Sequence, residues 1–119
     1  MGQTVSNEKD IIRMVPHDGS VVMIAVRVIR KGNIGGHAIY AFRNIFGLVR
    51  FMDRSVGTVF PTGTQGIFKS IDEIAPLYEA TLVPYQAAVL HNVFAKSFAH
   101  ELPRLAMPML GVIATEDKE

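Results

Sequence analysis

Two short apolar segments joined by a tight turn constrain the fold of this chain most. Residues 36–43 and 48–54 both favour extended structure, and the residues between them have the composition of a turn. Gly47 can adopt the left-handed backbone that closes a three-residue hairpin loop. The sequence therefore predicts an antiparallel β-hairpin in which Asn44 lies opposite Leu48.

The segment before this hairpin predicts a further strand. Residues 21–29 are apolar and β-branched almost without interruption, which is typical of a central strand covered on both faces. Residues 58–60 are expected to form the last strand of a small antiparallel sheet of about four strands.

Two short helices are expected to pack on this sheet. Residues 6–15 combine a cap at Ser6 or Asn7 with acidic residues in the first turn and apolar residues behind them. The segment 70–73 reads Ser-Ile-Asp-Glu, which is a capping box, so a second helix is expected to run to about Tyr78.

The C-terminal part of the chain predicts the longest helix and an apolar tail. Apolar residues recur at helical spacing from Tyr85 to Glu101, and His91 and His100 would lie on opposite faces of that helix, where they could not chelate one metal. The apolar run 105–114 has about ten residues, half of what a membrane span needs. It is too apolar to lie free in water, so residues 103–114 are expected to dock partly on the sheet and partly at an interface, giving an oligomer.

Composition sets the class of protein. Apolar residues make up 49% of the chain and the net charge is +1, which is typical of a globular protein, and the length of 119 residues suits a single domain. With the strands and helices above, the expected fold class over residues 1–119 is α+β. A charge so close to zero gives no electrostatic footprint for nucleic acid. There is no cysteine, which excludes disulfides and thiolate zinc sites, and no cofactor or metal is expected.

One histidine and one aspartate fall on the two strands of the hairpin. With a three-residue loop, Asp53 opposes Ile39 and lies diagonal to His37 on the same face of the sheet. A five-residue loop would place Asp53 directly opposite His37, and a four-residue loop would separate them on opposite faces. A carboxylate on one imidazole nitrogen fixes the tautomer of a general base. His37 and Asp53 are therefore candidate catalytic residues; the alternative is a strand-end histidine and a turn aspartate.

These segments resemble the C-terminal half of papain-fold toxin domains, which occur in bacterial polymorphic toxins and secreted effectors. The resemblance covers about residues 21–78 and is carried by Gly36-His37-Ala38, by Phe51-Met52-Asp53 and by the helix start at Ser70. It implies a papain-like fold, with His37 as the base and Asp53 as the orienting acid. It also implies thiolate attack on protein or peptide substrates, in proteolysis, deamidation or acyl transfer, by a secreted effector acting in a target-cell cytoplasm.

The chain departs from that family in its nucleophile, because it contains no cysteine. Three interpretations follow. The cysteine lies on another chain or in sequence outside this one, or Ser6 replaces it, or the domain is a non-catalytic module that binds a partner chain such as an immunity protein. The helix near Ser6 is expected to lie too close to the strand at Val21 to match the family. Because the thiolate is the nucleophile, the isolated chain is not expected to hydrolyse amides by a cysteine mechanism.

Overall fold

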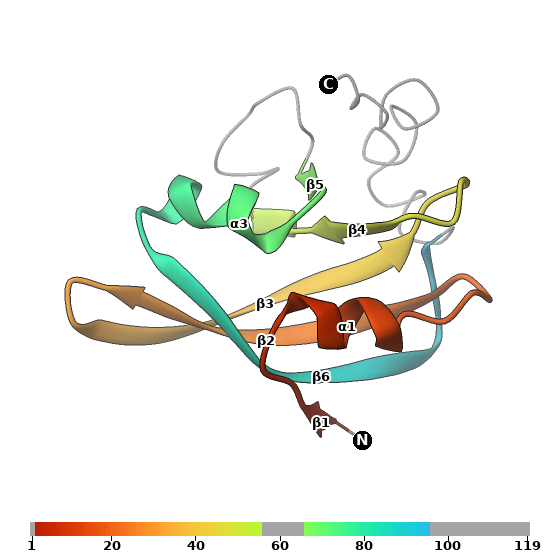
Figure 1. The fold of residues 1–119 in the computed structure, drawn as a ribbon, viewed down its shortest axis with the longest axis horizontal. Coiled ribbons are helices and arrows are strands. Elements are labelled where there is room, and N and C mark those ends of the chain that lie inside the picture. The colour runs from red at the N-terminus through yellow and green to blue at the C-terminus, as the bar shows by residue number, and fades with distance from the viewer. Residues whose placement is uncertain (1, 56–65, 96–119) are drawn as a thin grey trace.

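An antiparallel sheet with short helices packed on it forms the fold in the computed structural model, which describes residues 2–55 and 66–95 (Figure 1). Within those residues the sheet has six strands in the order β1-β6-β2-β3-β4-β5. The strands are β1 (Gln3–Thr4), β2 (Ser20–Arg30), β3 (Asn33–Arg43), β4 (Val49–Met52), β5 (Ile67–Phe68) and β6 (Thr81–Phe94). The helices are α1 (Glu8–Met14), α3 (Ile71–Ile74) and the 3-10 helix η1 (Ala75–Tyr78). The fold is thus α+β, and its sheet is larger than the four strands predicted.

Strand β2 occupies the middle of the sheet, between β3 and β6. Val21 and Val22 point to opposite faces and are both fully buried. Farther along β2 the cover is one-sided, because Met23 and Arg27 on the face of Val21 are exposed. The predicted central strand is confirmed, but it is covered on both faces only near its start.

The β3–β4 hairpin has the predicted three-residue loop. Arg43 pairs with Val49, and the Asn44 backbone N–H donates to the Leu48 carbonyl at 2.9 Å. Gly47 has a φ of 80°, in the left-handed region that favours glycine. The Asn44 side chain accepts hydrogen bonds from two backbone N–H groups of the loop. The register of the hairpin therefore follows from its turn chemistry.

The main core lies on one face of the sheet, beneath α1 and α3 (Figure 1). Asn7 caps α1 by accepting from the Asp10 backbone N–H, and the Ser70 side chain caps α3 by accepting from the Asp72 backbone N–H. The Glu8 carboxylate joins the two helices, because it accepts from both the hydroxyl of Ser70 and the backbone N–H of the next residue. The core residues without exposed surface are Ile11, Val22, Ile24, Val26, Ile39, Ala41, Phe51 and Ile74.

The predicted helix from Tyr85 to Glu101 is wrong over its described part, because residues 81–94 form strand β6. The strand pairs with β2 along nearly its whole length. A register irregularity lies near its end, where Val21 pairs with Leu90 but Ser20 pairs with Phe94. Such an irregularity interrupts the two-residue alternation of a strand, so apolar residues at 89, 90, 93 and 94 mimic helical spacing.

Several sequence predictions lie outside the described residues. These are the strand at residues 58–60, the position of His100, and the docking of the apolar tail at residues 103–114. Over residues 2–55 and 66–95, no helix combines the length and apolar character needed to cross a membrane.

Candidate functional site

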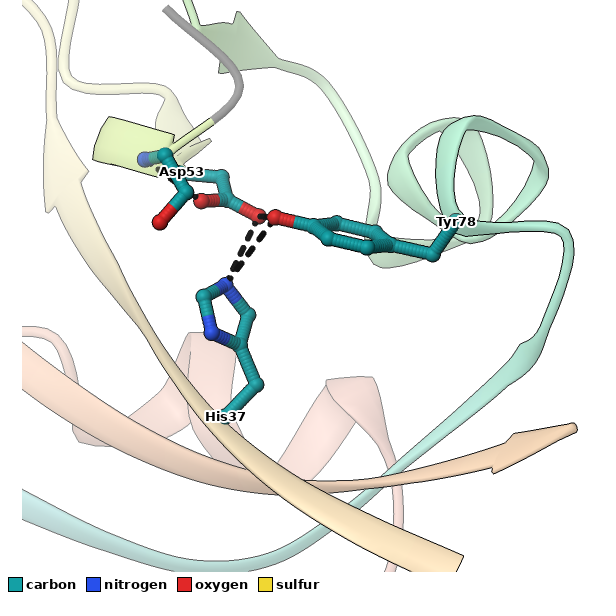
Figure 2. Close-up of polar contacts among 4 residues, drawn as sticks. His37, Asp53 and Tyr78 are labelled. Carbon is teal, nitrogen blue, oxygen red and sulfur yellow. Dashed lines mark hydrogen bonds and ion pairs between the residues drawn. The ribbon is translucent and has the colours of Figure 1, made fainter. Parts of the chain in front are cut away.

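The hairpin register brings His37 and Asp53 together on the core face of the sheet (Figure 2). His37 lies on β3 opposite Val26, and Asp53 follows Met52 at the end of β4. The Nε2 atom of His37 is 3.0 Å from Oδ2 of Asp53. The contact is the diagonal one that a three-residue loop predicts.

Asp53 is fully buried, and hydrogen bonds reach both of its carboxylate oxygens. Oδ1 accepts from the Ser55 backbone N–H at 3.0 Å, and Oδ2 accepts from the Tyr78 hydroxyl at 2.7 Å as well as contacting His37. Burial acts to raise the pKa of Asp53, but the hydrogen bonds from His37 and Tyr78 outweigh it and hold the pKa below its usual value. The carboxylate is therefore ionised at neutral pH.

His37 presents its two ring nitrogens to different surroundings. The hydrogen bond of Nε2 to Asp53 raises the pKa of His37, although burial acts in the opposite direction. An ionised carboxylate can only accept, so the neutral imidazole carries its proton on Nε2 and its lone pair on Nδ1. Within the described part of the chain nothing hydrogen bonds to Nδ1, and the side chain keeps 21% of its surface exposed. The basic nitrogen is thus the one turned away from Asp53.

Tyr78 is a third member of the site, which the sequence analysis did not identify. Its hydroxyl lies 3.2 Å from Nε2 of His37, in addition to its bond to Asp53, and the two rings are tilted by 54° (Figure 2). Burial and the bond to Asp53 raise the pKa of Tyr78 well above its usual value, so the phenol remains a donor. Tyr78 is far from both partners in sequence. The only signal in the sequence was its position at the expected end of the helix predicted to start at Ser70.

Two glycines precede His37 on β3 and leave open space along the strand. Gly35 lies on the same face as His37, and a Cβ atom there would meet only the Val28 carbonyl, at 4.0 Å. A Cβ atom on Gly36 would meet nothing within 4 Å. Two consecutive positions without side chains let another backbone approach the strand closely.

Ser6, the candidate replacement for the missing cysteine, serves the cap of α1. It is exposed, and its backbone N–H donates to the Asp10 carboxylate at 2.9 Å. The contacts of the described residues do not link Ser6 to His37, Asp53 or Tyr78. Among residues 2–55 and 66–95 there is also no group of three or more His, Cys, Asp or Glu side chains that could hold a metal ion.

The described site therefore contains an imidazole, a buried carboxylate that accepts from the Nε2 of that imidazole, and a phenol that donates to the same carboxylate. Comparison with family models, with curated proteins and with solved structures finds no significant match to this chain.

Proposed function

We propose that this chain is the base-bearing part of a papain-like thiol hydrolase that acts on peptide or amide carbonyls. The observation that carries the proposal is the buried Asp53 carboxylate on Nε2 of His37, which leaves Nδ1 as the basic nitrogen. The chain has no cysteine, so the proposal requires a thiol from another polypeptide or from sequence outside residues 1–119.

The chemistry follows from the two nitrogens of His37. Nδ1 takes the proton of the incoming thiol, and the negative charge of Asp53 stabilises the resulting imidazolium. The thiolate attacks the carbonyl carbon, and the imidazolium returns its proton to the departing amine as the carbon–nitrogen bond breaks. Water then attacks the thioester, with Nδ1 taking its proton, and the thiol is regenerated as the acid leaves.

A toxin or secreted-effector role is part of the same proposal. It rests on the resemblance of the Gly36-His37-Ala38 and Phe51-Met52-Asp53 segments to papain-fold toxin domains. Under it, the substrate is a protein or peptide in a target-cell cytoplasm, and an immunity protein is a natural partner.

The test is reconstitution with a cysteine-bearing polypeptide encoded beside this chain. Alkylation of the thiol by iodoacetamide and hydrolysis of a fluorogenic peptide amide are measured for the chain alone, the partner alone and the mixture. Only the mixture is expected to hydrolyse the amide, and His37→Ala is expected to slow hydrolysis by about 10²–10⁴-fold. The matched control is His91→Ala, an exposed histidine on β6. A mixture whose hydrolysis is insensitive to His37→Ala overturns the proposal.

A second candidate function is a non-catalytic module that binds a partner protein. It is favoured by a different observation, the three large apolar side chains exposed on the β3–β4 turn, with Ile45 at 69%, Phe46 at 70% and Leu48 at 50% exposure. A partner that binds tightly without any hydrolysis, and whose binding is weakened by Phe46→Ser but not by His37→Ala, supports this function over the enzymatic one.

A further inference from the structure

We propose that Tyr78 is a positioning residue of this site: its hydroxyl fixes the Asp53 carboxylate and the His37 ring so that Nδ1 stays the basic nitrogen. The inference rests on the proposed function, since it assigns a task in preparing the base. The contacts that support it lie within this chain, so it can be tested without a nucleophile.

The hydroxyl of Tyr78 contacts both other members of the site. It donates to Oδ2 of Asp53 at 2.7 Å, and its oxygen lies 3.2 Å from Nε2 of His37. Because the hydroxyl proton is directed at Asp53, the phenol oxygen can accept a hydrogen bond on its His37 side. The Nε2 proton therefore faces two acceptor oxygens, from Asp53 and Tyr78.

This arrangement selects one orientation of the imidazole ring. Turning the ring over would place a carbon-bound hydrogen against both oxygens and would leave the buried carboxylate without one of its donors. Moving the proton to Nδ1 would place the lone pair of Nε2 against Oδ2 of Asp53 and would leave the single hydroxyl proton of Tyr78 between two acceptors, Oδ2 and Nε2. Tyr78 thus disfavours both alternatives in addition to Asp53.

The backbone that carries Tyr78 is itself constrained at three points. The Arg30 guanidinium, at the end of β2, donates to the Tyr78 carbonyl through Nε at 3.0 Å and Nη2 at 2.7 Å. Glu79 turns the chain with a left-handed φ of 53° directly after η1. The helical segment begins at the Ser70 cap, which the Glu8 carboxylate holds against α1. A tyrosine anchored at its carbonyl and at both ends of its helical segment has little freedom to withdraw.

Among the described residues, no charged side chain other than that of Asp53 contacts the His37 ring. The ionisable groups that contact His37 there are Asp53 and Tyr78, and Arg30 hydrogen bonds to the backbone carbonyl of Tyr78. Tyr78→Phe keeps the ring that packs beside His37 at 5.3 Å between centroids and removes only the hydroxyl. The matched control is Tyr85→Phe, which removes a hydroxyl from the tyrosine stacked on Arg27, on the opposite face of the sheet.

The experiment is ¹⁵N NMR of the histidine side chains in the free chain at a pH where His37 is neutral. In the native chain the shifts are expected to show a protonated Nε2 and a bare Nδ1. In Tyr78→Phe they are expected to move toward the intermediate values of two exchanging tautomers, with His91 unchanged as internal reference and Tyr85→Phe identical to the native chain. Arg30→Gln, which releases the carbonyl of Tyr78, is expected to give a smaller shift in the same direction. If Tyr78→Phe does not fold, unchanged His37 shifts in Arg30→Gln overturn the positioning role.

Unchanged His37 shifts in a folded Tyr78→Phe variant overturn the positioning role, whatever becomes of the proposed function. Conversely, failure to reconstitute hydrolysis with any thiol overturns the proposed function and leaves the NMR result intact. In a reconstituted enzyme, the same variant is expected to lower kcat by roughly tenfold with little change in KM, because a misoriented base affects proton transfer more than binding.

Discussion

The Nε2 atom of His37 lies 3.0 Å from Oδ2 of Asp53, although the two residues are 16 positions apart and do not pair directly in the sheet. His37 lies beyond the last β3–β4 pair, Tyr40 with Met52, and Asp53 follows Met52. The contact is a diagonal one, set by the three-residue loop at Gly47. A loop one residue longer would turn Asp53 to the other face of the sheet, so the turn decides whether the pair forms.

Replacing His37 should give a pH-dependent loss of stability. The pKa of His37 is raised by its hydrogen bond to Asp53, so the pair contributes fully below the ordinary value of 6.5 and is lost as pH rises through the raised pKa. The His37→Gln substitution is therefore expected to lower the free energy of unfolding more near about pH 6 than near about pH 9. The difference between the two losses is expected to be on the order of 1 kcal/mol. Urea unfolding at the two pH values measures this. An equal loss at both would show that the pair contributes no charge-dependent stability.

Asp53→Asn should destabilise the fold and make His37 less basic. One end of the carboxylate faces the Ser55 backbone N–H, and the other faces donors from Tyr78 and His37. An amide has one donor end, so it either places its N–H against the Ser55 backbone N–H or faces Tyr78 and His37 with its N–H. The second orientation requires the Tyr78 hydroxyl to turn and His37 to move its proton to Nδ1. The expected cost is on the order of 1–3 kcal/mol, and loss of the negative charge lowers the pKa of His37.

The matched control for that variant is Asp72→Asn, an exposed aspartate in the first turn of α3. It is expected to change the unfolding free energy by less than about 0.5 kcal/mol. Urea unfolding and NMR titration of His37 compare the two variants. A folded Asp53→Asn protein with an unchanged His37 pKa would contradict the ion pair.

Turns and helix caps allowed much of the fold to be predicted, because single residues determine where a hairpin turns and where a helix begins. Gly47 fixed the hairpin loop, and with it the approach of Asp53 to His37. Ser70 marked the start of α3 through its side-chain hydrogen bond to the Asp72 backbone N–H. Such features depend on neighbours within a few residues, which the sequence displays directly.

The predictions failed for features that depend on contacts between residues far apart in the sequence. Strand β6 is stabilised by pairing with β2, and its register irregularity near Leu90 reproduced the spacing of an apolar helix face. Tyr78 enters the site only because Arg30 and the α3–η1 segment fold it back over the sheet. Neither the pairing partner of β6 nor the destination of the Tyr78 hydroxyl is encoded in local spacing.

Gly47→Ala should destabilise the hairpin through its backbone. Gly47 has a φ of 80°, which an alanine adopts at a cost of about 1–2 kcal/mol. The control is Gly36→Ala, since a Cβ there meets nothing within 4 Å and the φ is not in the left-handed region. That variant is expected to be neutral or to stabilise the protein by up to about 1 kcal/mol. Thermal or urea unfolding measures both, and equal effects would refute the turn assignment.

Two adjacent alanines of β6 offer a test of the strand itself. Ala87 is 2% exposed and pairs with the fully buried Ile24, whereas Ala88 pairs with Met23, which is 38% exposed on the other face. Ala87→Asp would bury a carboxylate in the main core without a partner, and it is expected to lower the free energy of unfolding by roughly 3 kcal/mol or more. Ala88→Asp places the same group on the partly open face and is expected to cost less than about 1 kcal/mol.

This contrast depends on the alternation of a strand, because consecutive side chains of β6 point to opposite faces of the sheet. In a helix, positions 87 and 88 would be separated by only about 100° of rotation, and two aspartates there would differ much less. Urea unfolding of the two variants gives the difference in free energy, and amide hydrogen exchange of Ala87 and Ala88 reports the pairing with β2. Similar costs for the two substitutions, together with helix-like protection across residues 85–94, would restore the helix that the sequence spacing suggested.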